Sequence, residues 1–293
     1  MSSFRERNDR HRPNFTSPQT GPAAPGREDP HGKRRAPHKR FPAEDLDQWI
    51  WGWHACEAAL CNPDRPAPKR ILATPERAEA IQRLRGADGR PLAVDLKAEI
   101  MANGDIAQAL PPGAVHQGLA IRTPPLDSAD LEAFCLVPQG LLVMLDCVTD
   151  PQNVGAIFRA AAAFGAKGVI LQDRRAPPLA GALAKAAAGA LERLPCAQVT
   201  NLSRALDQLA EAGWRAVGLA GDAERDLEAA LSDHPTVLVL GSEGDGLRRL
   251  VSERCDVLAR IDMQGGFESL NVASAASVAL YAASRLMARK GTP

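Results

Sequence analysis

Three short blocks of the chain carry residue types that could hold a ligand. In chain order they read Asp-Pro-Gln-Asn-Val-Gly-Ala-Ile-Phe-Arg (150–159), Gly-Ser-Glu-Gly-Asp-Gly-Leu (241–247) and Glu-Ser-Leu-Asn-Val-Ala (268–273). Together they offer a guanidinium, a carboxylate on a glycine loop, and uncharged hydrogen-bonding groups suited to a ribose, a carboxylate or a phosphate. Each block alone also has an ordinary structural interpretation.

The glycine block follows an apolar strand and precedes a helix, which is typical of a ligand-binding loop. Its glycine spacing is close to that of a phosphate-binding loop, but Leu247 and Arg248 stand where Lys and Ser/Thr are required. A nucleotide-dependent α/β enzyme therefore stays a weakly supported alternative. Glycine does suit close backbone approach to an adenosyl ligand. Glu243 is the informative residue of the loop, although a surface turn acid is a serious competing interpretation.

The other two blocks each open a helix. Asn153 and Arg159 are six positions apart, and Arg159 is followed by Ala160–Ala163, so small neighbours leave the guanidinium room to meet a ligand. A plain surface arginine is the alternative. Ser269 and Asn271 begin the last long helix, where both residue types are also good helix caps. Asp146 and Asp150 are expected as turn and cap residues of the first block.

Strands and helices alternate after residue 140, which predicts an α/β fold with a parallel sheet covered on both faces. Strands are expected over 141–145, 168–171, 216–219, 237–240 and 257–261, and helices over 154–164, 179–191, 202–212, from 247, and over 270–287. This arrangement brings the three blocks to strand ends and helix starts.

A smaller α/β unit is predicted over residues 47–122, with strands at 70–73 and 115–122 and a helix at 76–85. Trp49, Trp51 and Trp53 alternate in strand period. They could form a stacking platform for RNA bases, but a buried strand face is favoured. Residues 123–139 are interpreted as a linker and residues 140–293 as the second domain.

Residues 1–46 are predicted to be a disordered basic tail. Residues 1–40 hold 10 Lys and Arg against 4 Asp and Glu, a net charge of +6, while the whole chain is neutral and residues 41–293 therefore carry −6. The tail is interpreted as an arm that adds affinity for phosphate backbone, with a merely solvated tail as the alternative. Any contact that residues 41–293 make with phosphate must therefore come from a local cluster of basic residues, or else the tail supplies it.

The six cysteines form no C-x-x-C pair, and the histidines outside the tail have no zinc-ligand spacing. We expect a reduced cytoplasmic protein without a metal. No apolar stretch reaches the length of a membrane span, so no membrane partner is expected.

Together and in this order, the three blocks resemble the motifs of the SpoU/TrmH family of RNA ribose 2′-O-methyltransferases, a branch of the SPOUT superfamily. The resemblance implies a trefoil knot in the C-terminal domain and a homodimer. It places the family's invariant positions on Asn153, Arg159, Glu243, Ser269 and Asn271. The signatures Gly-Trp-His-Ala (52–55) and His-Gln-Gly (116–118) are similar to the ribosomal-protein-like RNA-binding domain of the bacterial 23S rRNA guanosine 2′-O-methyltransferases.

The resemblance also implies S-adenosylmethionine as the cofactor. The matching positions are Gly241, Ile261 and Leu270, with Met263 and the loop at Leu219 nearby. The chain departs from the family at Asp262, where proline is usual, so the cofactor loop loses some rigidity. Guanidinium stays protonated in proteins, so we interpret Arg159 as the group that positions a phosphate and the 2′-oxygen, while the proton leaves through phosphate, water or Glu243.

The expected substrate is structured RNA, because a 2′-hydroxyl acceptor distinguishes RNA from DNA. A guanosine of 23S rRNA is favoured. A tRNA ribose methyltransferase and a non-catalytic RNA-binding or ribosome-assembly factor on the same scaffold remain alternatives.

Overall fold

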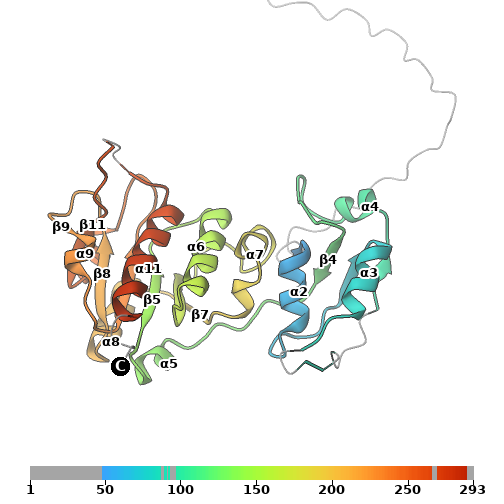
Figure 1. Cartoon of the computed structure of the whole chain (residues 1–293), viewed down its shortest axis with the longest axis horizontal. Coiled ribbons are helices and arrows are strands. Elements are labelled where there is room, and N and C mark those ends of the chain that lie inside the picture. Colours follow the sequence, from blue (N-terminus) through green and yellow to red (C-terminus); the bar gives the residue numbers. More distant parts are fainter. Residues whose placement is uncertain (1–47, 87–88, 91, 93–96, 266–268, 289–293) are drawn as a thin grey trace, which may run out of the picture. The chain divides into compact units, whose positions relative to one another are not determined.

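The structure is a computed structural model that describes residues 48–86, 89–90, 92, 97–265 and 269–288 (Figure 1). The predicted basic tail of residues 1–46 lies outside the described residues, and so does Glu268 of the third block.

The larger sheet of the described chain has seven parallel strands in the order β7-β6-β5-β10-β8-β11-β9. The strands are β5 (Leu141–Leu145), β6 (Gly168–Gln172), β7 (Cys196–Val199), β8 (Arg215–Leu219), β9 (Arg225–Asp226), β10 (Thr236–Leu240) and β11 (Val257–Arg260). Because all of them run the same way, their carboxyl ends meet at one edge. β10 lies between β5 and β8. From β5 the chain adds β6 and β7 on one side of β10, and β8, β9 and β11 lie on the other side. Ligand sites are favoured where the strand order reverses in this way.

Both faces of this sheet are covered by helices (Figure 1). In β5, Leu141, Val143 and Leu145 pack on one face, while Leu142 and Met144 pack on the other, as the two-residue period of a strand requires. The first face is covered by α6 (Pro151–Ala163), α7 (Gly181–Ala187) and α11 (Val272–Ala288), the second by α5 (Leu131–Leu136) and α8 (Leu202–Glu211). Shorter elements are η1 (Ala190–Glu192), α9 (Leu227–Ala230) and α10 (Arg249–Ser252).

Helix α6, which carries the first block, begins where the sequence predicts a cap. The Asp150 carboxylate accepts a hydrogen bond from the backbone N–H of Gln152 at 3.0 Å, and Pro151 occupies the first helical position, where its missing N–H costs nothing. Gly155 lets α6 approach α7 closely, because a Cβ at this position would lie 2.5 Å from the Leu183 carbonyl oxygen. The start of α6 is thus fixed both by its cap and by its neighbour.

A second, four-stranded sheet has the order β1-β4-β2-β3. Its strands are β1 (Trp49–Trp51), β2 (Arg70–Ala73), β3 (Glu99–Ile100) and β4 (Leu119–Arg122), accompanied by α2 (Trp53–Cys61), α3 (Pro75–Gln82) and α4 (Asn103–Gln108). Trp49 and Trp51 are buried, which confirms the core interpretation for these two. Trp53 instead begins α2, and the Arg77 guanidinium lies 4.8 Å from its ring centroid.

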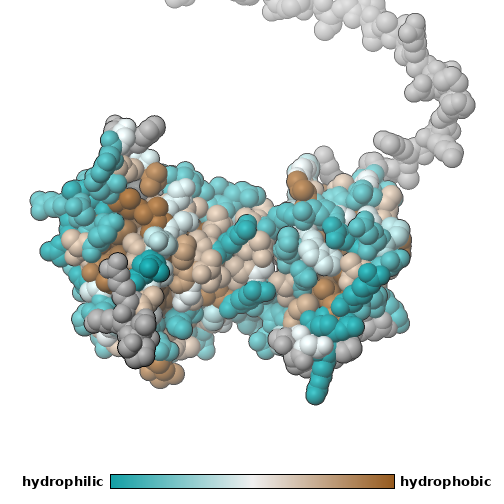
Figure 2. Space-filling view, viewed as in Figure 1, coloured by the Kyte–Doolittle hydropathy of each residue, from teal (hydrophilic) through white to brown (hydrophobic). Residues whose placement is uncertain are grey.

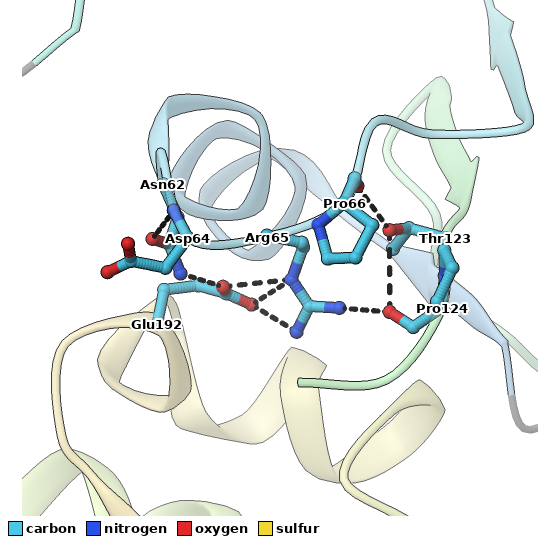
Figure 3. A network of polar contacts seen from close by, with 7 residues as sticks. All are labelled: Asn62, Asp64, Arg65, Pro66, Thr123, Pro124 and Glu192. Atoms are coloured by element: carbon cyan, nitrogen blue, oxygen red, sulfur yellow. Dashed lines mark hydrogen bonds and ion pairs between the residues drawn. The ribbon is translucent and has the colours of Figure 1, made fainter. Parts of the chain in front are cut away.

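A buried ion pair ties the end of α2 to η1 (Figure 3). Arg65 donates to Glu192 from Nη2 at 2.7 Å and from Nε at 2.9 Å, and the two side chains are only 2% and 4% exposed. Asn62 donates to the same carboxylate, and Arg65 also donates to the Pro124 carbonyl oxygen. All the polar groups of this contact are therefore satisfied by protein atoms, as a buried charge requires.

Candidate functional site

A hollow of about 740 Å³ opens at the carboxyl ends of β8, β10 and β11. Its lining includes every residue that the sequence assigned to the cofactor: Leu219, Gly241, Ile261, Met263 and Leu270. These residues come from four separate segments, and the parallel sheet brings them together because each of the three strands ends at this edge.

The glycine block closes on itself at the mouth of β10. Ser242 and Gly246 exchange two backbone hydrogen bonds of 3.1 Å, and Gly244 and Gly246 have positive φ angles of 92° and 66°, which glycine adopts without strain. A Cβ at Gly241 would collide with the backbone of Gly246. The loop therefore needs its glycines for its own shape, and Gly241, Gly244 and Gly246 contribute backbone to the lining of the hollow.

Asn153, Glu243 and Asn271, one residue from each block, meet beside this hollow. Glu243 Oε1 accepts hydrogen bonds from Asn271 Nδ2 at 2.7 Å, from Asn153 Nδ2 at 3.1 Å and from the backbone N–H of Val272 at 3.3 Å. Asn271 Nδ2 also donates to Asn153 Oδ1 at 2.9 Å. Three donors on one oxygen fix the carboxylate and leave Oε2 for an outside partner.

Asn271 combines the two roles that its position suggested. Its Oδ1 accepts from the backbone N–H groups of Ala273 and Ser274 at 3.0 and 3.3 Å, which makes it the cap of α11. Its Nδ2 meanwhile donates to the Glu243 cluster. The cap interpretation is confirmed for this residue, and its role in the site stays a prediction.

The two other predicted site residues do not join the cluster. Ser269 is exposed and lines the hollow. Arg159 is exposed on α6, and within the described part of the chain it makes no hydrogen bond or ion pair. Six residues of helix separate it from Asn153, a rise of about 9 Å. Its guanidinium is therefore free to meet a partner from outside the chain.

The sequence did not indicate a contact between Asp146 and Arg248. Asp146 is not a cap but a fully buried carboxylate that accepts from Arg248 Nε at 2.6 Å and from the Arg248 backbone N–H at 2.8 Å. The pair joins the end of β5 to the residue after the glycine loop, and so holds the first two blocks in register. An isolated acid at the end of an apolar strand was its only sequence signal.

Two of the cysteines are poor nucleophiles near neutral pH. Burial raises the pKa of the Cys196 and Cys255 thiols to about 12, so both stay protonated near neutral pH. Over the residues that the structure covers, no cluster of three His, Cys, Asp or Glu could hold a metal ion. Nor does any helix of that part have the length and apolarity to cross a membrane.

Comparison with known proteins finds relatives that are named as methyltransferases. A curated protein of Mycobacterium avium, named as an uncharacterized tRNA/rRNA methyltransferase, is 43% identical over 175 residues, 58% of this chain and 57% of that protein. One of the same name from Mycolicibacterium vanbaalenii is 45% identical over 171 residues, 57% of this chain and 54% of that protein. The chain thus spans little more than half of the length of these relatives.

Solved structures extend the likeness to most of the chain. The SpoU methyltransferase AviRb from Streptomyces viridochromogenes superposes with a TM-score of 0.68 at 25% identity, covering 84% of this chain and 91% of that one. The same enzyme in complex with the cofactor AdoMet shares the fold, with a TM-score of 0.67. Residues 140–281, which carry the whole site, match the SpoU rRNA methylase family. Through this domain the chain is similar to the SpoU methylase family.

Proposed function

We propose that the protein transfers a methyl group from S-adenosylmethionine to a ribose 2′-hydroxyl of structured RNA, with a guanosine of 23S rRNA as the favoured target. The observation that carries this proposal is that Glu243 and Asn271 belong both to the hydrogen-bonded cluster and to the lining of the hollow. A fixed carboxylate therefore borders the space where a ligand would lie.

The hollow fits S-adenosylmethionine. The Gly241 loop offers backbone where no Cβ is tolerated, and the side chains of Leu219, Ile261 and Leu270 give apolar walls for a base. Bound there, the cofactor supplies an electrophilic methyl group on a sulfonium. Asp262 stands exposed between Ile261 and Met263, and both neighbours still line the hollow.

The chain's own residues orient the acceptor. Glu243 Oε2 is available to accept a hydrogen bond from the ribose hydroxyl, while Asn153 and Asn271 hold the carboxylate in place. Arg159 holds a neighbouring phosphate, since its guanidinium keeps its charge. Positioning of this kind lowers the barrier by aligning the reacting atoms in advance.

Mapping 2′-O-methyl marks tests this function. Deleting the gene is expected to remove one 2′-O-methylguanosine from 23S rRNA, and the wild-type chain should restore it while Arg159→Ala should not. The purified protein should bind S-adenosylmethionine in calorimetry. Loss of a mark from tRNA instead would move the substrate to tRNA, and unchanged rRNA and tRNA would contradict the proposal.

We also propose a homodimer that packs through α6 and α11. A groove of about 530 Å³ between these helices is lined by small residues such as Ala156, Ser274 and Ser277, and Val278 and Tyr281 on α11 are 42% and 56% exposed. Figure 2 shows mildly apolar residues over this part of the surface. Sedimentation equilibrium should give twice the chain mass of 31.2 kDa; a monomer at micromolar concentration would contradict this.

The remaining features are proposed on the family likeness. We propose a trefoil knot in residues 140–293, a ribosomal-protein-like RNA-binding role for residues 47–122, and a cytoplasmic location. Arg77 stacks on the half-buried Trp53, and such a pair presents both charge and a ring face. This pair supports an RNA-facing surface on the unit of residues 47–122. The six free cysteines are compatible with a reducing compartment.

A further inference from the structure

A second, smaller hollow lies at the other half of the same sheet edge. It measures about 270 Å³ and opens at the carboxyl ends of β6 and β7. Its lining combines hydrogen-bond donors with two arginines: Gln172, Thr200, Asn201, Leu202, Ser203, Arg248, Arg249, Leu250 and Val251. The cofactor hollow lies at the ends of β8, β10 and β11. Strand β5 lies between β6 and β10, so it separates the two hollows along the edge of the sheet.

Further arginines lie close in the sequence to residues that line this second hollow. Arg174 and Arg175 follow Gln172 at the end of β6, and Arg204 follows Ser203 in the first turn of α8; all three are exposed. Neither Arg174 nor Arg204 has an ion-pair partner within the described chain. Two guanidinium groups are thus uncompensated beside a hollow that already contains two more.

The acidic groups of this region are already bound to protein atoms. Asp173 accepts from the Arg174 backbone N–H at 2.6 Å and from the Thr200 hydroxyl at 3.1 Å, so it serves the loop and not the arginine side chains. Asp146 is buried against Arg248, and Glu253 pairs with Arg249. The surface charge at the hollow is therefore positive, although residues 41–293 as a whole carry −6.

The surface formed by Arg174, Arg175 and Arg204, here called the arginine surface, is connected to the first two sequence blocks. Arg175 Nη1 contacts Cys147 Sγ at 3.4 Å, and Cys147 lies between β5 and Asp150, the cap of α6. Arg248 connects to both sides, because its Nη2 donates to Gln172 Oε1 at 2.9 Å and its Nε binds Asp146. The segment that leads from β5 into α6, the helix that carries Asn153, therefore contacts Arg175 and Arg248.

We propose that the hollow and the neighbouring arginines Arg174, Arg175 and Arg204 bind phosphate groups of the RNA backbone next to the nucleotide being methylated. This inference rests on the proposed function and deepens it by assigning the substrate a path along the β5-β6-β7 half of the edge. Guanidinium, hydroxyl and amide donors recognise phosphate oxygens. The described lining contains no aromatic ring on which a base could stack.

The salt dependence of RNA binding tests this surface in the full-length protein. The probe is an RNA hairpin of mixed sequence, titrated between about 50 and 200 mM KCl. The double variant Arg174→Ala/Arg204→Ala should bind more weakly, and its log–log salt slope should fall by about 1.5, because each lost phosphate contact removes about 0.7–0.9. Replacing both arginines with lysine should keep most of the slope, since the charge remains.

Arg193 is the matched control. It is an exposed arginine that precedes β7 and so lies at the amino end of the strands, opposite the hollow. Arg193→Ala should leave the slope unchanged. Equal slopes for the double variant and this control would overturn the proposal, provided that calorimetry shows unchanged cofactor binding.

The two proposals fail separately. If the wild-type chain leaves RNA unmethylated while the double variant loses salt-dependent binding, the arginine surface stands and the proposed function falls. If the wild type methylates RNA and the double variant binds like the wild type, the function stands and the arginine surface falls.

Discussion

Arg159→Ala is expected to lower methyl transfer by on the order of 10²–10³-fold, the usual loss when a preorganised charge at a reaction site is removed. Cofactor affinity should stay close to that of the wild type, because Arg159 is exposed on α6 and lies outside the cofactor hollow. The measurement is turnover with tritiated cofactor at saturating RNA, alongside calorimetry of cofactor binding.

Arg159→Lys should rescue little of this activity, since a point charge cannot reproduce the planar fork that binds two oxygens. Loss of an interaction made chiefly in the transition state lowers kcat and kcat/KM together, whereas loss of ground-state affinity raises KM. Near wild-type turnover of the alanine variant at high RNA concentration would make Arg159 an RNA anchor only. Arg193→Ala serves again as the control for a lost surface charge.

Glu192→Gln is expected to lower the free energy of unfolding by about 3–5 kcal/mol, because it leaves the Arg65 charge buried without its counterion. The side chains are 2% and 4% exposed, so water cannot take the place of the carboxylate. In a thermal melt this corresponds to roughly 10 °C.

The chain contains a matched exposed pair. Arg70 donates to both Glu99 oxygens at 2.8 and 2.7 Å, but the two side chains are 33% and 49% exposed. This contact holds the pKa of Glu99 below its ordinary value, yet Glu99→Gln should cost less than about 1 kcal/mol because solvent screens the pair. If Glu192→Gln and Glu99→Gln lowered the free energy of unfolding equally, burial would not set the strength of the Arg65–Glu192 ion pair.

Residue pattern predicted the larger sheet well where strands are long and apolar. β5 and β10 are buried along their whole length and were recognised as continuous apolar runs. β7 was missed, because its four residues, Cys-Ala-Gln-Val, are short and partly polar, as an edge strand allows. The helix expected over 179–191 is broken after α7, where Ala188 and Gly189 take φ angles of 49° and 90°.

The predicted linker also carries structure that its composition conceals. Residues 131–136 form α5, and Leu131 and Phe134 are buried against β5 and α8. Trp214 Nε1 donates to the Phe134 carbonyl oxygen at 2.9 Å. Six residues hold too little periodicity to reveal a helix whose burial depends on partners as far as 80 positions away.

The candidate site was predictable as a set of blocks but not as a geometry. Asn153, Glu243 and Asn271 come together because β5, β10 and α11 adjoin, which no local pattern specifies. The pairing of Asp146 with Arg248 spans 102 positions and had no sequence signal beyond an acid after a strand. Long-range pairs are set by strand order, and strand order is what the periodicity of a single chain leaves open.

The place of β10 has a consequence for how the chain acquires its structure. β10 pairs along its length with β5 on one side and with β8 on the other, yet it is synthesised after both. Until residue 240 emerges, neither neighbour has a partner on that edge, so the sheet cannot grow outward from a finished centre. β10 must instead be inserted between strands that begin 95 and 21 positions before it, and such non-local closure slows folding. During synthesis, β5 therefore keeps an unpaired edge until β10, the strand that leads into the glycine loop, has emerged.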